Sequence, residues 1–155
     1  MHLETDDALM PQYVCELPKD AQTMAALEEV LMKNKDIAGV LVEPLIQGAG
    51  GMQVFNGDVL KTLRELCTKY DVLLIFDEIF TGFGRTGALF GADKAGVVPD
   101  IMTLGKALTG GVTPLAATMA TDEVFNAFYD HDPAKALMHG PTFCGHALGL
   151  SLIHI

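Results

Sequence analysis

The segment Val72–Lys106 constrains the fold more than any other part of this chain. It contains two short apolar runs, Val72–Phe76 and Ile101–Leu104, which do not alternate with polar residues. Runs of this kind, bounded by turn residues, are typical of buried parallel strands. The first run is followed directly by Asp77, and the second is followed, after one glycine, by Lys106. Because open α/β sheets bind ligands outside the carboxyl ends of their strands, the segment predicts a carboxylate and an amine at one functional edge.

A third strand and a helix precede this segment. The run Ala38–Val42 reads as a buried strand that ends on Glu43, and a helix from Gly57 to Tyr70, with Asn56 as its N-cap, leads to the central strand. Strand, helix and strand in succession form a βαβ unit, which favours a right-handed crossover and a parallel sheet. We therefore predict an α/β fold with a mostly parallel sheet and flanking helices. Its strands would bring Glu43, the central acid and the lysine to one edge, where opposite charges meet in partly desolvated surroundings.

The remaining sequence predicts several further elements. They are a short strand at 13–15, a helix capped by Asp20 and running to Lys33, an irregular glycine-rich loop at 47–51, an apolar run at 115–119, a helix at 122–129, a loop at 130–143 and a helix from about Gly145.

Composition narrows the classes of partner. The chain has 155 residues, is 50% hydrophobic and carries a formal net charge of −10 with no basic cluster, so a nucleic-acid or membrane partner is not expected. Its three cysteines do not pair in sequence, which favours reduced thiols in a cytoplasmic protein. No apolar run approaches the roughly 20 residues of a membrane helix. The five histidines show no metal-ligand spacing, and we expect no metal site.

Two nucleotide-binding chemistries could also use such a segment. A strand ending on acids can hold Mg²⁺ in an ATPase, but that chemistry also requires the phosphate loop G-x-x-x-x-G-K-[ST]. Gly105 and Lys106 do not match it, because position 100 is aspartate instead of glycine and position 107 is alanine instead of serine or threonine. The run Gly82–Gly87 matches the dinucleotide fingerprint G-x-G-x-x-G. It does not join a strand directly to a helix, and no acidic residue ends a further strand about 20 residues on. Both chemistries are disfavoured.

The remaining interpretation is a Schiff-base lysine. Lysine forms an imine with a carbonyl only as the free amine, which requires partial desolvation or a nearby cation. Lys106 lies between an apolar strand and a loop of small residues, which suits that need. Pyridoxal phosphate is an electron sink whose ring nitrogen stays protonated when a carboxylate faces it, and Asp77 is the natural candidate for that carboxylate.

These residues resemble the class III, fold-type I pyridoxal-phosphate aminotransferases. The resemblance runs from about Ala38 to Gly149 and rests on three motifs, Val42–Met52, Phe76–Gly87 and Leu104–Gly111. It implies that residues 1–155 are the central part of a large domain that binds pyridoxal 5'-phosphate. The family's upstream phosphate loop, an aromatic stacking residue and a downstream arginine have no counterpart here. We therefore expect a fragment, with its N-terminal segment and C-terminal small domain missing and with residues 151–155 of foreign origin.

The resemblance assigns a role to several residues. Lys106 would carry the cofactor as a Schiff base and move the proton, Asp77 would pair with the pyridinium nitrogen, and Ile79 would pack against one face of the ring. Glu43 would lie at the edge of the active site, among the substrate-binding residues.

A second group of residues would act across a subunit boundary. Pro141 and Thr142 would bind the cofactor phosphate in the partner's site, with Gly140 near the substrate, which implies a homodimer with shared active sites. Phe80 stands where ornithine- and aminobutyrate-type members carry glutamine, and it argues for another branch of the class.

Two motifs, Gln47–Met52 and Met138–Phe143, look most like the biotin-pathway branch of the class. That likeness implies amino transfer from S-adenosylmethionine to 8-amino-7-oxononanoate, giving 7,8-diaminononanoate. Two alternatives stay open: an ω-amino-acid or diamine aminotransferase of the same class, and an incomplete piece without activity of its own.

Overall fold

The computed structural model describes residues 13–154, and the chain divides into two compact units, residues 1–35 and 36–155. In the first unit, helix α1 (Ala21–Lys33) begins after Asp20, whose Oδ1 accepts a hydrogen bond from the Thr23 backbone N–H at 2.8 Å. This confirms the predicted cap and helix. The strand predicted at 13–15 is wrong: these residues have no regular structure, because so short a run finds no neighbouring strand to complete a ladder.

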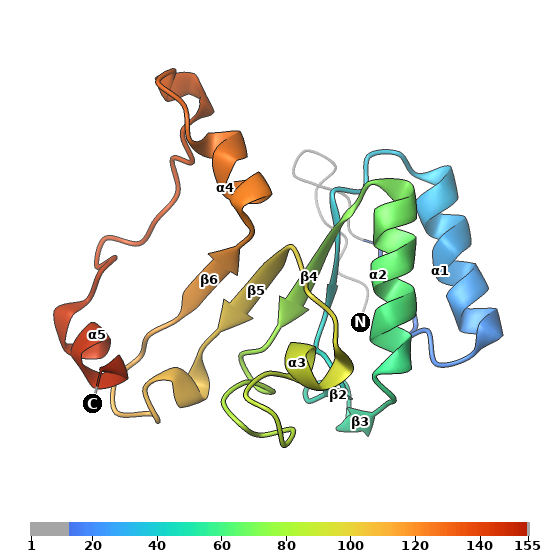
Figure 1. The fold of residues 1–155 in the computed structure, drawn as a ribbon, viewed down its shortest axis with the longest axis horizontal. Helices are drawn as coiled ribbons and strands as arrows, with labels where there is room; N and C mark the ends of the chain where they lie inside the picture. Colours follow the sequence, from blue (N-terminus) through green and yellow to red (C-terminus); the bar gives the residue numbers. More distant parts are fainter. Residues whose placement is uncertain (1–12, 155) are drawn as a thin grey trace. The chain divides into compact units, whose positions relative to one another are not determined.

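The second unit contains a four-stranded sheet in the order β1-β4-β5-β6 (Figure 1). Its strands are β1 (Gly39–Val42), β4 (Leu73–Asp77), β5 (Ile101–Leu104) and β6 (Ala117–Ala120). Strand β4 pairs in parallel with both β1 and β5, which confirms the parallel strands expected from the apolar runs. Strand β6 pairs antiparallel with β5, so the sheet is mostly parallel.

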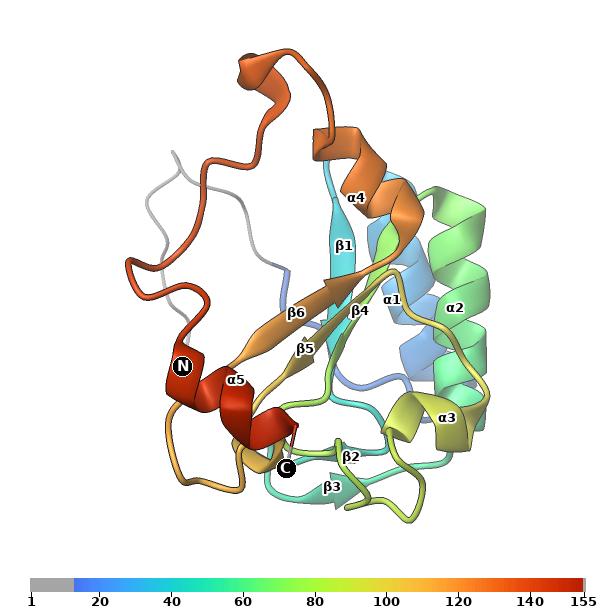
Figure 2. The ribbon, with the colours of Figure 1, turned by 60° about the vertical axis from the view of Figure 1, so that its left-hand side comes forward.

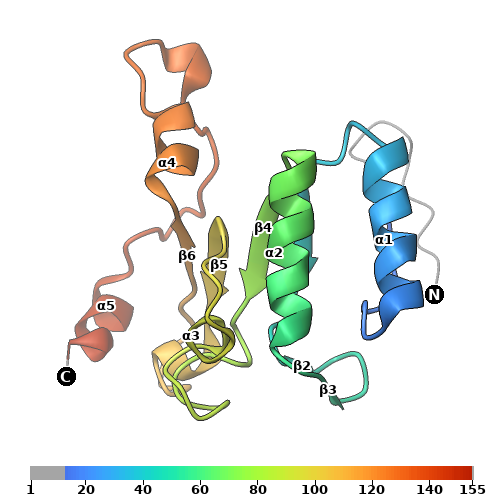
Figure 3. The ribbon, with the colours of Figure 1, turned by 45° about the vertical axis from the view of Figure 1, so that its right-hand side comes forward.

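Helix α2 (Asp58–Tyr70) packs against β4 and forms the core of this unit with it (Figures 2 and 3). Four helix residues are buried, namely Leu60, Leu63, Leu66 and Cys67. On the strand side, Leu74 and Phe76 are fully buried. The helical period alone does not select Leu60 for this buried face, because several registers of the period fit so short a sequence.

The start of α2 differs slightly from the prediction. The helix begins at Asp58 with Gly57 as its N-cap, and the Asn56 side-chain oxygen still accepts the Asp58 backbone N–H at 3.1 Å.

Asp100, which directly precedes β5, connects the helix to the sheet. Its Oδ2 accepts both the Arg64 guanidinium at 2.7 Å and the Leu74 backbone N–H at 2.6 Å. This carboxylate therefore ties the helix to the sheet.

Most of the segment at 47–51, predicted as an irregular loop, is the turn of a small hairpin. Strands β2 (Ile46–Gln47) and β3 (Gln53–Val54) pair antiparallel around it. The other short elements are α3 (Gly91–Ala95), η1 (Lys106–Leu108), α4 (Asp122–Phe128), η2 (Pro133–Lys135) and α5 (Ala147–Ile153). No helix in the described part of the chain has the length and apolar character to cross a membrane.

The buried thiol of Cys67 gives a first testable expectation. Burial raises its pKa to about 11, because the charged thiolate loses its hydration. At pH 8 this leaves about 100-fold less thiolate than in an ordinary cysteine, so alkylation by iodoacetamide should be slower at Cys67 by at least that factor. Cys15 and Cys144 are exposed and serve as references. Peptide mass spectrometry gives the three rates; similar rates in the folded protein would contradict the burial, whereas similar rates in urea are expected.

Candidate functional site

Three candidate residues follow the carboxyl ends of neighbouring parallel strands. Glu43 follows β1, Asp77 is the last residue of β4, and Lys106 lies two residues beyond the end of β5. Since the strands are parallel and adjacent in the order β1-β4-β5, the three residues emerge at one edge of the sheet. The predicted placement at a single edge is confirmed.

Asp77 is partly buried, and its carboxylate is oriented from two sides. Its Oδ1 accepts the Ile79 backbone N–H at 3.0 Å and the Thr103 hydroxyl at 3.2 Å. Thr103 lies directly opposite Asp77 in the β4–β5 ladder, so the sheet register itself supplies this contact. Within residues 13–154, Oδ2 receives no hydrogen bond, which leaves it free to accept one from a cationic ring N–H.

Lys106 stands at a sharp change in backbone direction. It opens the short turn η1 with φ of 41°, in the left-handed region that residues other than glycine rarely adopt. The preceding Gly105 packs against Ile79, since a Cβ at this position would lie 3.3 Å from Ile79 Cγ2. The Lys106 side chain is exposed, so the desolvation expected around its amine is not found in this chain. The residues on either side of Lys106, Gly105 and Ala107, are small and provide too little cover for its side chain.

A cavity of about 650 Å³ opens beside Lys106. Its lining residues are Ile79, Gly105, Lys106, Thr109, Gly111, Thr113, Pro114, Leu115 and Ala116. The cavity thus brings together two residues that the sequence assigned to cofactor binding, Ile79 and Lys106. Asp77 is joined to the same place through its hydrogen bond to the Ile79 N–H. Amine, apolar wall and oriented carboxylate fit a planar, nitrogen-containing ring with a carbonyl group.

Glu43 and Phe80 are connected through the hairpin turn. The Glu43 carboxylate is partly buried and accepts the Gly48 backbone N–H at 3.1 Å. Gly48 also packs closely on Phe80, because a Cβ on this glycine would lie 3.1 Å from Phe80 Cδ1. Glu43 therefore fixes the turn that contacts the Phe80 ring, a role that the sequence did not predict.

Glu78 was overlooked by sequence reasoning, although it is fully buried. Its carboxylate accepts hydrogen bonds from the Thr81 hydroxyl, from the Gly91 N–H at 3.0 Å and from the Ala92 N–H at 2.8 Å. It thereby connects the end of β4 to the start of α3 and closes the loop between them. The sequence offered one signal for this role: Thr81 places a hydroxyl three residues after Glu78, and local hydrogen bonds of this kind are common in turns.

The residues predicted to act in a partner subunit lie apart from this site. Gly140, Pro141 and Thr142 are exposed, and none of them lines the cavity that contains Lys106. Their assignment stays a prediction. Within the described residues, no group of three or more histidine, cysteine, aspartate or glutamate side chains is placed to hold a metal ion.

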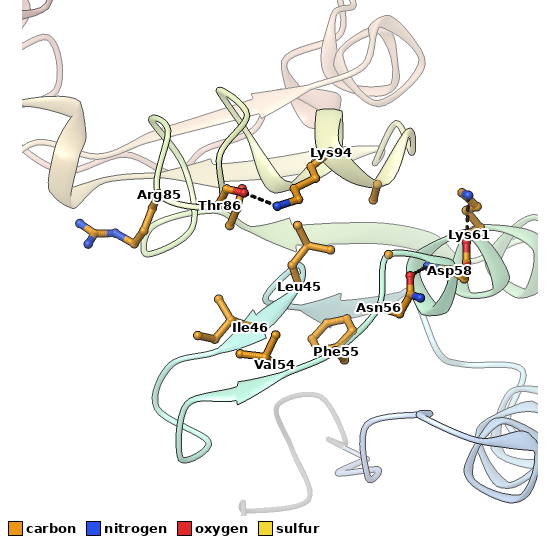
Figure 4. A pocket seen from close by; sticks show the side chains of 12 residues that line it. Leu45, Ile46, Val54, Phe55, Asn56, Asp58, Lys61, Arg85, Thr86 and Lys94 are labelled. Atoms are coloured by element: carbon orange, nitrogen blue, oxygen red, sulfur yellow. Dashed lines mark hydrogen bonds and ion pairs between the residues drawn. The ribbon is translucent and has the colours of Figure 1, made fainter.

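A second cavity, of about 460 Å³, lies between the hairpin and the loop before α3 (Figure 4). None of the residues predicted to bind the cofactor or a substrate lines it. Lys94 Nζ donates to the Thr86 carbonyl at 2.6 Å, and Lys61 pairs with Asp58 at 2.9 Å. The Arg85 side chain points away from these groups (Figure 4).

Comparison with known proteins places these observations in a family. The family described as Aminotransferase class-III matches residues 6–154. The adenosylmethionine-8-amino-7-oxononanoate aminotransferase of Mycobacterium leprae is 46% identical over 156 aligned positions, which cover 98% of this chain and 36% of that protein. The protein of the same name from Aquifex aeolicus is 50% identical over 133 positions, covering 85% of this chain and 29% of the relative. The chain thus spans about a third of the length of these relatives.

Solved structures agree with the sequence relatives. An (S)-enantioselective ω-transaminase from Thermomicrobium roseum has a TM-score of 0.80 and 38% identity, over 86% of this chain and 30% of that one. The ornithine aminotransferase of Toxoplasma gondii has a TM-score of 0.74 and 44% identity, over 84% of this chain and 29% of that one. That structure is described as showing partial occupancy of PLP at the active site.

Proposed function

Because this chain belongs to the class III aminotransferase family, whose members depend on pyridoxal 5'-phosphate, we propose that it is the central part of that cofactor's binding domain. The amino donor in this proposal is S-adenosylmethionine and the acceptor is 8-amino-7-oxononanoate. Several relatives at 43–50% identity carry the name of this biotin-pathway enzyme, which supports the choice of substrates.

The observation that carries the proposal is the placement of Asp77, Ile79 and Lys106. An oriented carboxylate with a free oxygen, an apolar side chain and a primary amine come together at the carboxyl edge of a parallel sheet. Each matches one requirement of the cofactor: a partner for the ring nitrogen, a wall for the ring face and an amine for the carbonyl.

When bound, pyridoxal phosphate supplies the electron sink that makes the amine-bearing carbon of a substrate acidic. In the proposed mechanism, Asp77 Oδ2 would accept a hydrogen bond from the protonated ring nitrogen, and Ile79 would pack against the ring. Lys106 Nζ takes the proton from the amine-bearing carbon of the donor. It returns a proton to the carbonyl carbon of the acceptor in the second half of the reaction.

The remaining assignments follow from the same proposal. Pro141 and Thr142 would hold the cofactor phosphate of a partner subunit, with Gly140 and Glu43 near the substrates, in a cytoplasmic homodimer. The exposure of residues 140–142 supports this arrangement, because a backbone amide and a hydroxyl there are free to meet a phosphate. Small-molecule substrates suffice for such an enzyme, and the proposal includes no nucleic acid or membrane.

A second candidate keeps the chemistry and changes the substrate. The likeness to an ω-transaminase, with a TM-score of 0.80, favours an ω-amino acid or a diamine as amino donor. The residues that contact Lys106 in this chain do not distinguish the two candidates, since both require the same proton transfers.

Borohydride trapping in the full-length protein tests the proposal. We expect pyridoxal phosphate to produce an imine absorbance band and borohydride to fix the cofactor on Lys106, as read by peptide mass spectrometry. Purified protein is then offered 8-amino-7-oxononanoate with S-adenosylmethionine, ornithine or lysine as donor. Trapping on another lysine would refute the mechanism, whereas turnover only with ornithine or lysine would favour the second candidate.

A further inference from the structure

The side chain of Lys106 has one defined neighbour in the described part of the chain. Its Nζ lies 5.4 Å from the centroid of the Phe80 ring, and no residue among 13–154 offers this nitrogen a hydrogen bond or an ion pair. The backbone at Lys106 is fixed by the turn η1, yet four rotatable bonds separate Nζ from it. The aromatic ring is therefore what restrains the amine.

The Phe80 ring is itself held in place. It is partly buried and follows Ile79, whose backbone N–H is bound by Asp77. On another side it contacts Gly48, where any Cβ would come within 3.1 Å of the ring, and the Gly48 N–H is bound by Glu43. The ring thus lies between the end of β4 and the hairpin turn, and both neighbours are fixed by carboxylates.

A second cation shares the same ring. Arg85 Cζ lies 5.0 Å from the Phe80 centroid, and Arg85 also belongs to the lining of the cavity beside the hairpin (Figure 4). The face of an aromatic ring carries negative potential and attracts cations at these distances. Two cations at one ring compete for that potential and repel each other, so removing either one strengthens the hold on the other.

We propose that Phe80 is a positioning residue whose ring holds the Lys106 ammonium at the mouth of the cofactor cavity before the cofactor binds. The inference rests on the proposed role of Lys106 as the cofactor-binding lysine. It adds a contact at the edge of the site, in which Phe80 restricts the amine and Arg85 weakens that restriction.

Competitive acetylation of the full-length, cofactor-free protein tests this contact. Trace acetic anhydride labels each lysine in proportion to its free and accessible amine, and peptide mass spectrometry gives the individual rates across pH. Phe80→Leu keeps an apolar side chain and removes the ring, so Lys106 should label about two- to fivefold faster, the factor expected for one exposed cation–π pair. Phe80→Tyr should label like the wild type. Lys61 and Lys135, each paired with an aspartate, are internal references.

Two further sets of variants extend the labelling experiment. Replacing Phe80 by phenylalanines with one, two and three fluorines weakens the ring's negative face at nearly constant shape, and the labelling rate should rise stepwise with each fluorine. This series remains informative if the leucine variant does not fold. Arg85→Gln should act in the opposite direction and slow the labelling of Lys106, because the ring then serves one cation.

An unchanged Lys106 rate in Phe80→Leu, or a flat fluorine series, would overturn the inference while trapping of the cofactor on Lys106 leaves the proposed function intact. If instead borohydride fixes no cofactor on Lys106, the proposed function fails and the positioning role fails with it, whatever the labelling rates.

Discussion

Replacing Lys106 by alanine is expected to lower the transamination rate of the full-length protein by at least about 10²–10⁴-fold, the contribution of a positioned acid–base group. No other amine lines the cavity beside Ile79, as far as the described residues extend. The variant therefore has no side chain to take over the proton transfers. The loss should appear in both half-reactions, measured separately by rapid mixing of each substrate with the matching form of the cofactor.

Lys61→Ala is the matched control for this prediction. Lys61 is exposed, pairs with Asp58 on helix α2 and does not line the cavity that contains Lys106. Its loss should leave the rate near that of the wild type, since exposed ion pairs contribute little. A Lys106→Ala variant that keeps more than a tenth of the wild-type rate would contradict the assignment of the proton transfers.

Replacing Glu78 by alanine is expected to lower the free energy of unfolding by at least about 3 kcal/mol, because each stranded buried donor costs roughly 1–3 kcal/mol. The substitution removes the acceptor of the Thr81 hydroxyl and of two backbone N–H groups, at Gly91 and Ala92. Water cannot replace the carboxylate easily, since both Glu78 and Thr81 are fully buried. Urea unfolding followed by circular dichroism measures the loss.

Two other variants calibrate this result. Glu78→Gln keeps one acceptor oxygen in nearly the same position, so its free energy of unfolding should fall less than that of the alanine variant. It should still fall, because the new amide N–H₂ group faces other donors. Glu65→Ala changes an exposed glutamate on helix α2 and should stay within about 0.5 kcal/mol of the wild type. If Glu78→Ala were as mild as Glu65→Ala, the buried carboxylate would not hold the loop together.

The arrangement of the parallel strands could be predicted because its signals are local. The apolar runs that became β4 and β5 do not alternate with polar residues. The helix that became α2 lies in the sequence between the runs that became β1 and β4. A strand–helix–strand unit favours parallel pairing, and parallel neighbours have their carboxyl ends at the same edge of the sheet. Asp77 and Lys106 followed from that rule, because each lies next to the end of its run.

Other features depend on residues that are distant in the sequence. The hairpin β2–β3 was missed because its strands are very short and their pairing depends on a turn rich in glycine. The strand predicted at 13–15 was wrong because a β-favouring run that has no neighbouring strand to pair with does not form a ladder. The exposure of Lys106 was also unforeseen, because burial depends on what covers the β5–β6 connection.

By itself, the sequence determined the parallel strands, their helix and the delivery of Asp77 and Lys106 to one edge, because hydrophobic pattern and the strand–helix–strand order act within a few tens of residues. Only the tertiary structure decided that Glu78 is buried as a three-fold acceptor and that Phe80 faces both Lys106 and Arg85. These contacts join loops from different strand ends. Their geometry depends on the packing of glycines such as Gly48 against a ring, which no local pattern encodes.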